Sequence, residues 1–446
     1  MDFTHPFRFG AVTVRSAPQA FVRVAVEVEG RGVATGATAE MMMPKWFDKR
    51  PHLTPEDTIE GLRRSLVAAR GHYLASSGLD TAFGHHKRGY RASMTESGRP
   101  QLASAYGPAV IDKAVLDALF RACGVNALEG FRRNLPGMDA GLTPDIVDSP
   151  ILDFLAALAP SDRIAVRWTV GMLDDLGDLE RRIAATGLKF LKVKVGGDVD
   201  ADLDRLRAVA AILERTGDVR VSLDGNEQYD LARLRSLCDA LKRDAALAPL
   251  RQRLFYIEQP LARDDTLSTS LYGIADDMAF IIDEADGGYD AFPRAVAAGY
   301  RGVSSKSCKG IYKALLNAVR AENLNRAAGA PARYFVTGED LTCQAGLAVQ
   351  QDTALAALLG AGHVERNGHH YVSGFGGAPA AEARAFLAAH PDLYAESGDS
   401  VVLTTRRGAL ATGSLLTTRG FASGAEPDWT SLTPFSTTSH PERISS

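Results

Sequence analysis

Two lysines separated by one residue lie in a short apolar segment, and their type and spacing are suited to chemistry. Lys192 and Lys194 fall within residues 187–197, GLKFLKVKVGG. Alternate side chains of an extended strand share a face, so both ammonium groups point the same way, and a lysine is almost never fully buried unless it is paired. Two interpretations are open: an edge strand with two solvated lysines, or a strand end that faces something anionic.

Three acidic residues follow later apolar segments at the same relative place. They are Asp224 in LDGN, Glu258 in IEQP and Asp283 in IIDE. One such acid is commonly a helix cap or a loop residue, but three on consecutive strands are harder to explain in this way. Neighbouring barrel strands lie about 4.8 Å apart, so their end side chains converge, and converging carboxylates repel unless a cation neutralises them. Ligation by oxygen alone suits Mg²⁺, or Mn²⁺ as a substitute, rather than zinc.

A further lysine, Lys306 in SSKSCKG, follows the sixth apolar segment. In a closed barrel it lies roughly opposite Lys194, so the two lysines form an acid/base pair that flanks a metal-bound ligand. Burial and a nearby cation both disfavour the ammonium form, so we expect such a lysine to have a lowered pKa and to act as a general base near neutral pH.

The elements that must position these residues begin near residue 164. From there short apolar segments alternate with amphipathic helical stripes, which indicates a parallel barrel that carries its functional residues at the carboxyl ends of the strands. The expected strands are residues 164–170, 188–195, 219–223, 254–257, 280–282, 302–305, 334–336 and 362–364.

The first 150 or so residues predict a different, α+β unit. Residues 21–28 alternate and then break at glycines, as antiparallel strands with tight turns do. Thr54 is a helix-start signal, and a second helical stripe runs from after Pro108 to Gly124. The apolar segment 41–49, MMMPKWFDK, is either core or a lid over a ligand.

A polar insert at residues 81–91 contains two adjacent histidines, His85 and His86. Adjacent side chains do not share a face of a strand or a helix, so the insert is predicted to be a solvated loop.

Composition excludes several classes of function. The 446 residues carry a net charge of −4 with a pI of about 6.2, which offers no basic surface for nucleic acid. The first residues lack the features of a secretory signal, and no apolar run reaches membrane-spanning length, so the predicted location is cytoplasmic. The four cysteines have no CxxC spacing and are expected to be ordinary buried thiols.

Taken together, KVKVG, LDGN, IEQP, IDE and SKSCKG resemble the enolase superfamily, specifically its mandelate racemase and muconate lactonizing (cycloisomerase) family. VEVEGRGVATGATAE is similar to the cap segment of that family, and GPAVIDKAVLDALFRACGV to the helix that leads into its barrel. The resemblance implies a modified TIM barrel, (β/α)₇β, with an α+β capping domain formed by the N-terminal region and the C-terminal segment. The expected domains are residues 1–155 (cap), 160–375 (barrel) and 376–446 (segment returning to the cap).

The resemblance also implies roles for individual residues. Lys194 and Lys306 would be the acid/base pair, and Lys192 would contact the substrate carboxylate. Asn226 and Glu284 are similar to residues that orient ligands and lysines from behind. The implied Mg²⁺ ligands are Asp224, Glu258 and Asp283.

The sequence departs from the family pattern after the last two strands. The seventh segment ends without the histidine base of the mandelate racemase type, which favours the two-lysine arrangement; Glu339 there either contacts substrate or caps the next helix. The eighth, HVERNGHH, lacks the paired aspartates with which many dipeptide epimerases hold a substrate amine. Asn367, His369 and His370 stand in their place, and His369 either binds substrate or lines a loop.

Three hypotheses of function follow. The first is a Mg²⁺-dependent enzyme that abstracts the proton α to a carboxylate to form a metal-stabilised enolate, as a racemase, epimerase or cycloisomerase. The second is a lyase that dehydrates a hydroxy or sugar acid at the same site. The third is a non-catalytic barrel that binds or scaffolds, although binding alone does not need two lysines beside a metal. The expected partner is a small-molecule carboxylate, not nucleic acid or a membrane, and the chain is expected to form a homo-oligomer.

Overall fold

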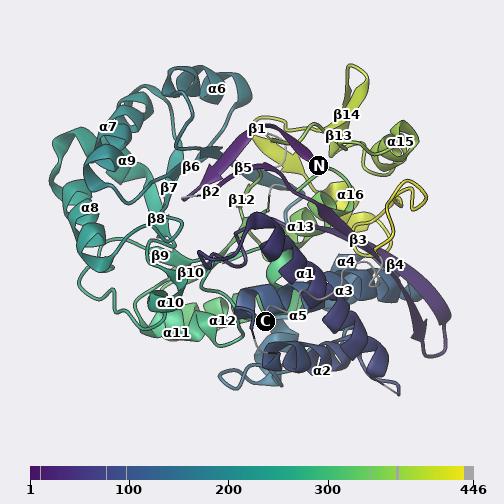
Figure 1. The fold of residues 1–446 in the computed structure, drawn as a ribbon. Helices are drawn as coiled ribbons and strands as arrows, with labels where there is room; N and C mark the ends of the chain where they lie inside the picture. The colour runs from purple at the N-terminus through teal and green to yellow at the C-terminus, as the bar shows by residue number, and fades with distance from the viewer. Residues whose placement is uncertain (11, 77, 97, 342, 368–370, 436–446) are drawn as a thin grey trace, which may run out of the picture.

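Eight parallel strands close into a barrel, with helices on the outside (Figure 1). This computed structural model describes residues 1–10, 12–76, 78–96, 98–341, 343–367 and 371–435. The strands follow one another around the barrel in chain order, and the last pairs with the first. They are β5 (Arg163–Val170), β6 (Phe190–Lys194), β7 (Arg220–Asp224), β8 (Leu254–Glu258), β9 (Phe280–Ile282), β10 (Gly302–Ser305), β11 (Phe335–Glu339) and β12 (His363–Glu365).

Helices connect these strands on the outer surface of the barrel, which gives the predicted (β/α)₇β order. Each predicted apolar segment from residue 164 onward corresponds to one strand. β11, predicted at residues 334–336, extends to Glu339 and therefore carries this acid as its last residue. The connecting helices are α6 (Leu179–Thr186), α7 (Val199–Arg215), α8 (Leu231–Arg243), α9 (Ala248–Arg253), α10 (Arg263–Thr266), α11 (Ala291–Ala297), α12 (Ile311–Ala328) and α13 (Leu347–Leu358).

The N-terminal part forms the predicted separate α+β unit, beside the barrel in Figure 1. Thr54 starts its first helix as expected: its side chain accepts a hydrogen bond from the Asp57 N–H, and the Asp57 carboxylate accepts one from the Thr54 N–H. The strands pair as two antiparallel hairpins. The elements are β1 (Asp2–Phe9), β2 (Val12–Ser16), β3 (Gln19–Val28), β4 (Gly32–Met41), α1 (Pro55–Ala75), α2 (Ala82–Thr95), α3 (Gln101–Cys123), α4 (Ala127–Arg132) and α5 (Asp148–Ala156).

The prediction of a solvated loop at residues 81–91 is wrong. These residues lie in α2, whose N-cap Thr81 accepts a hydrogen bond from the Gly84 N–H. Phe83, His86 and Tyr90 are buried on one face at helical spacing. The adjacent histidines suggested a loop because they cannot share a face, but only His86 belongs to the buried apolar stripe of the helix.

The second cap helix begins earlier than predicted, at Gln101 rather than after Pro108, which lies inside α3. Pro108 has no N–H to bond the Ser104 carbonyl oxygen, and the Ser65 hydroxyl of α1 donates to that oxygen at 3.2 Å instead. Gly107 lets α1 come this close. Its N–H is accepted by the Ser65 hydroxyl of α1 at 3.1 Å, and a Cβ at this position would lie 2.2 Å from the Ser65 carbonyl oxygen. The close approach of α1 thus supports a helix that the local sequence disfavours.

The C-terminal segment contacts both other parts of the chain. Its strand β15 pairs antiparallel with β5 of the barrel, and the Phe421 N–H and Ser423 hydroxyl donate to Asp117 of α3. The domain bounds 1–155, 160–375 and 376–446 stay a prediction. The elements are α15 (Ala380–Ala389), β13 (Tyr394–Ser397), β14 (Ser400–Leu403), β15 (Ala409–Ala411) and α16 (Gly413–Thr417).

The four cysteines are free thiols; Cys238, Cys308 and Cys343 are buried, and Cys123 is half-buried. Within the described ranges, every helix is too short or too polar to cross a membrane.

Candidate active site

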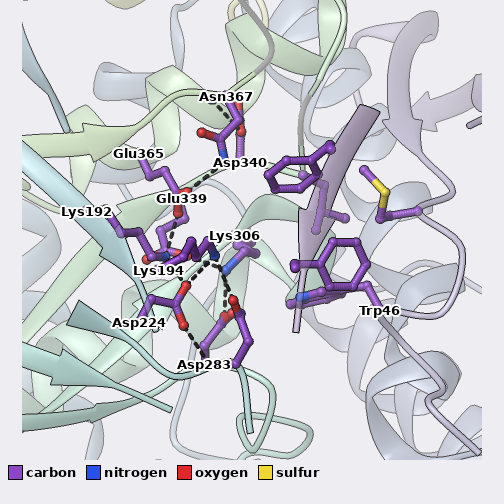
Figure 2. A pocket seen from close by; sticks show the side chains of 15 residues that line it. Trp46, Lys192, Lys194, Asp224, Asp283, Lys306, Glu339, Asp340, Glu365 and Asn367 are labelled. Carbon is purple, nitrogen blue, oxygen red and sulfur yellow. Dashed lines mark hydrogen bonds and ion pairs between the residues drawn. The ribbon is translucent and has the colours of Figure 1, made fainter. Parts of the chain in front are cut away.

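The carboxyl ends of the barrel strands and the cap enclose a pocket of about 360 Å³, part of it open to solvent (Figure 2). The barrel supplies a charged floor and the cap an apolar wall. From the barrel come Lys192, Lys194, Asp224, Asn226, Asp283, Lys306, Glu339, Asp340, Leu341, Glu365 and Asn367, and from the cap Phe7, Phe9, Met43 and Trp46.

The apolar segment 41–49, for which the sequence left core or lid open, packs in the core of the cap and also lines the pocket. Met43 and Trp46 line the pocket. Phe47 instead packs edge-on against Tyr106 of α3, with ring centroids 5.2 Å apart. The cap core therefore holds the segment over the strand ends.

Lys194, the last residue of β6, contacts the end of the neighbouring strand. Its Nζ donates to Asp224 Oδ2 at 2.5 Å and to Asn226 Oδ1 at 2.9 Å. β6 and β7 pair with Lys194 opposite Asp224, which sets the first contact. The chain then bends through Asn226, whose positive φ of 42° is uncommon for a residue with a side chain, and this bend returns the amide toward the lysine.

Lys306 follows β10 on the other side of the pocket and is buried among acids. Its Nζ donates to Asp283 Oδ1 at 2.6 Å and to Glu339 Oε2 at 2.5 Å, and it lies 5.1 Å from the ring centroid of Trp46. Burial alone lowers the pKa of Lys306, but the carboxylates of Asp283 and Glu339 outweigh it and hold the pKa well above its usual value. The lowered lysine pKa expected from the sequence depended on a neighbouring cation, and the carboxylates alone act in the opposite direction.

Lys192 lies at the centre of the charged floor. Its Nζ is 3.0 Å from Asp224 Oδ2 and 2.9 Å from both Glu258 and Glu339, and it donates to Glu365 Oε2 at 2.6 Å. Burial lowers the pKa of Lys192, and the four carboxylates together raise it well above the usual value. The interpretation as a solvated edge-strand lysine is therefore wrong, because β6 is an inner barrel strand and its lysines are buried.

Buried carboxylates at these strand ends form a group that could hold a metal ion. Glu258, Asp283 and Glu339 each offer an oxygen, and the three oxygens lie within 4.8 Å of one another. Burial, and then the charge of Glu339, raise the pKa of Glu258 well above its usual value. Such mutual repulsion is what a divalent cation relieves, and an all-oxygen donor set fits Mg²⁺ or Mn²⁺.

The predicted ligands are thus brought into one site, though not as a single group of three. Glu258 and Asp283 face each other together with Glu339, whereas the Asp224 carboxylate contacts Lys192 and Lys194.

Gln259 supports the predicted ligand Asp283 from behind. It has a φ of 35°, and its side-chain oxygen accepts the Asp283 N–H at 2.8 Å.

The remaining predicted residues lie around this site. Glu284 is buried and accepts a hydrogen bond from the Asn226 amide at 3.3 Å. This is a position from which it could orient Asn226. Glu339 points into the barrel and does not cap a helix, since the next helix, α13, has Gly346 as its N-cap. His369 lies outside the described residues.

Two buried groups were missed from the sequence. Glu365 ends β12 and bonds Lys192, Thr169 and Asn367; it follows an apolar segment as the predicted acids do, so the same signal could have found it. Arg167, inside β5, is fully buried and donates to Glu339 Oε1 at 2.8 Å. A cation inside an otherwise apolar strand was its signal, as for Lys192.

Comparison with known proteins identifies the class of barrel. The family model described as enolase C-terminal domain-like matches residues 175–369, from before β6 through β12. No curated protein matches the chain in sequence.

Solved structures extend the likeness over most of the chain. A mandelate racemase/muconate lactonizing protein from Herpetosiphon aurantiacus is 19% identical, with a TM-score of 0.55 over 90% of this chain and 96% of that chain. A muconate lactonizing enzyme from Pseudomonas fluorescens complexed with muconolactone is 18% identical, with a TM-score of 0.59 over 96% and 94%. A member of the enolase superfamily from Roseovarius nubinhibens ISM is 16% identical, with a TM-score of 0.60 over 97% and 94%.

The fold is therefore a TIM barrel with a capping domain, and the barrel is an enolase C-terminal domain-like domain. The predicted resemblance to the enolase superfamily is confirmed for the barrel by the family model over residues 175–369, and the solved structures share the fold of most of the chain.

Proposed function

We propose that this protein is a divalent-cation-dependent enzyme, with Mg²⁺ as its metal, that removes the proton α to the carboxylate of a small acid and acts as a racemase, epimerase or cycloisomerase. One observation carries this proposal. Lys194 and Lys306 end or follow strands four positions apart in an eight-stranded barrel, and both line the same pocket. A pocket with an amine on either side of its ligand can exchange a proton on either face of that ligand.

In this proposal Asp224, Glu258 and Asp283 would hold the cation. When bound, the cation supplies positive charge against the negative charge that develops on the substrate carboxylate. Lys192 would contact the same carboxylate, and its ammonium form suits this role because the surrounding acids keep it protonated. Glu339, between Lys192 and Lys306, would be a further contact for the substrate.

The two lysines divide the proton transfers. One of them, as the free amine, accepts the α-proton, and the other, as the ammonium, can return a proton from the opposite face. Return from the opposite face inverts the carbon, whereas loss of a β-group ends in elimination or ring opening. Asn226 would orient Lys194, to which it is bonded at 2.9 Å. Glu284 would orient Asn226 in turn.

The apolar wall favours isomerisation of a substrate with an apolar group over dehydration of a sugar acid. Phe7, Phe9, Met43, Trp46 and Leu341 face the charged floor and offer no hydrogen bond from their side chains apart from the indole N–H. A lyase on a hydroxy acid is the second candidate. It is favoured by Asn367, whose buried Oδ1 has no hydrogen-bond partner in the described part of the chain and could accept from a substrate hydroxyl.

The test is exchange of α-hydrogens with solvent deuterium across a panel of aromatic, aliphatic and sugar acids, with and without MgCl₂. We expect metal-dependent exchange by the wild type, and loss of exchange from at least one face of the substrate in Lys194→Ala and in Lys306→Ala. Lys189→Ala is the matched control, because Lys189 precedes the same strand but is exposed. Exchange that persists unchanged in both lysine variants would contradict the proposal; a wild type that binds acids without exchanging them would support the non-catalytic hypothesis.

A further inference from the structure

Three charged side chains join the cap to the barrel at the edge of the pocket; we call Lys49, Glu227 and Arg263 the clasp. Arg263, at the start of α10, donates from Nε to Glu227 Oε1 at 2.8 Å and from Nη2 to Glu227 Oε2 at 2.9 Å. Lys49, from the cap, forms an ion pair with the same Glu227 carboxylate. Glu227 and Arg263 are largely buried, with side-chain exposures of 7% and 13%, so water screens this cluster less than a surface pair.

Arg263 also holds the pocket wall directly. Its Nη1 donates to the Phe47 carbonyl oxygen at 3.0 Å, and its Nη2 donates to the Trp46 carbonyl oxygen at 2.9 Å. Trp46 is the wall residue that covers Lys306. The backbone that carries this indole is therefore fixed by a barrel arginine, which Glu227 orients in turn.

Lys49 reaches further, to the group behind Lys194. Its Nζ lies 3.3 Å from Glu284 Oε1 and donates to the Asn226 carbonyl oxygen at 3.3 Å. Glu284 accepts from the Asn226 amide, and Asn226 accepts from Lys194. The ammonium of Lys49 is thus the first member of a continuous chain of contacts that ends at a lysine of the pocket.

The local backbone is bent to make these contacts. Asn226 and Glu227 have φ values of 42° and 72°, in the left-handed region that residues with side chains rarely adopt. Two such residues in succession cost on the order of 1 kcal/mol each, and they persist only where the surroundings hold them. The clasp and the chain of contacts to Lys194 hold this turn together with backbone hydrogen bonds, among them the one from the Glu227 N–H to the Gln259 carbonyl oxygen at 2.8 Å.

We propose that Lys49 is a positioning residue for Lys194, and that the clasp makes closure of the cap segment 41–49 and alignment of Lys194 a single event. The part that concerns Lys194 rests on the proposed function; the fastening of the segment does not. Loss of the Lys49 charge leaves Glu284 without this cation and frees Asn226 to turn away from Lys194. It also removes the ion pair between Lys49 and Glu227, the carboxylate that orients Arg263 against the wall.

The fastening is tested without substrate by hydrogen–deuterium exchange of the backbone amides in residues 41–50, followed by mass spectrometry. We expect Lys49→Met and Arg263→Met to exchange there about tenfold faster than the wild type, while the barrel strands are unaffected. Arg50→Met is the matched control, because Arg50 pairs with Asp48 inside the cap at 2.6 Å. Equal exchange in Lys49→Met and the wild type, or equal acceleration in Arg50→Met, would overturn the proposal.

The positioning role is tested on turnover of an acid that the wild type exchanges. We expect Lys49→Met to lower kcat about tenfold to a hundredfold, the usual cost of losing a supporting contact behind an active-site group, and Lys49→Arg to restore most of it. A change in KM alone, or no rescue by arginine, would overturn this part. If the wild type exchanges no acid, the proposed function fails, whereas a Lys49→Met variant that is as active as the wild type contradicts only the positioning role of Lys49.

Discussion

Replacing Lys192 by methionine should destabilise the protein strongly, because this ammonium balances several buried charges. Four carboxylates lie within 3.0 Å of its Nζ, and the residue is 1% exposed. Removing one partner of a buried ion pair costs about 3–5 kcal/mol, since the remaining charge is left without compensation. For a barrel of this size the cost corresponds to a fall in unfolding temperature of roughly 6–20 °C.

The measurement is thermal unfolding at pH 7, followed by near-ultraviolet circular dichroism, for the wild type, Lys192→Met and Lys189→Met. Lys189 directly precedes β6 but is exposed. Surface substitutions usually change the free energy of unfolding by no more than about ±0.5 kcal/mol, so Lys189→Met should unfold within a degree or two of the wild type. MgCl₂ should raise the midpoint of Lys192→Met more than that of the wild type, because a bound cation supplies part of the missing charge. Equal midpoints for Lys192→Met and the wild type would refute the assignment of Lys192 as the charge that balances the floor.

Two further predictions concern stability. Burial, and then Arg167, lower the pKa of His363 to about 2, so below pH 6.5 only the unfolded state takes up this proton. The free energy of unfolding therefore decreases by about 1.4 kcal/mol for each unit by which the pH is lowered. Between pH 7 and pH 5, urea unfolding should show His363→Gln losing about 2 kcal/mol less than the wild type, and equal losses in the two proteins would contradict this. Gly36→Ala should prevent normal folding, because its Cβ would lie 2.2 Å from the Ala114 carbonyl oxygen where β4 crosses α3, whereas Gly61→Ala, which meets nothing within 4 Å in α1, should raise the free energy of unfolding by about 0.5–1 kcal/mol in the same urea assay.

The barrel could be predicted from the sequence because its strands are short apolar runs, and every one after β5 ends in or is followed by a charged residue. Periodicity placed all eight strands, and the lysines and acids marked their carboxyl ends. The start of α3 and the whole of helix α2 were missed, because both depend on distant contacts. α3 continues through Pro108 because α1 packs on Gly107, and α2 exists because His86 and its neighbours face the barrel residue Tyr289.

The candidate site was predictable as a set of residues but not as a network. Each predicted acid was found from its own strand, whereas Glu365 was missed, and nothing in the local sequence tells which carboxylate meets which lysine. That Asp224 contacts Lys194, while Glu339 lies between Lys192 and Lys306, depends on barrel register and closure. The contact of Lys49 with Glu284 joins residues far apart in the chain and follows only from the docking of the cap.

We expect the buried carboxylates at the strand ends to form a divalent-cation site beside two lysines. Electron paramagnetic resonance of Mn²⁺ titrated with the protein tests it directly and needs no substrate. One Mn²⁺ should bind per chain and be displaced by Mg²⁺. Binding should be lost in Glu258→Gln and in Asp283→Asn but kept in the control Glu60→Gln, because Glu60 lies on α1 in the cap. Mn²⁺ that does not bind the wild type, or that binds both barrel variants as tightly, would contradict it.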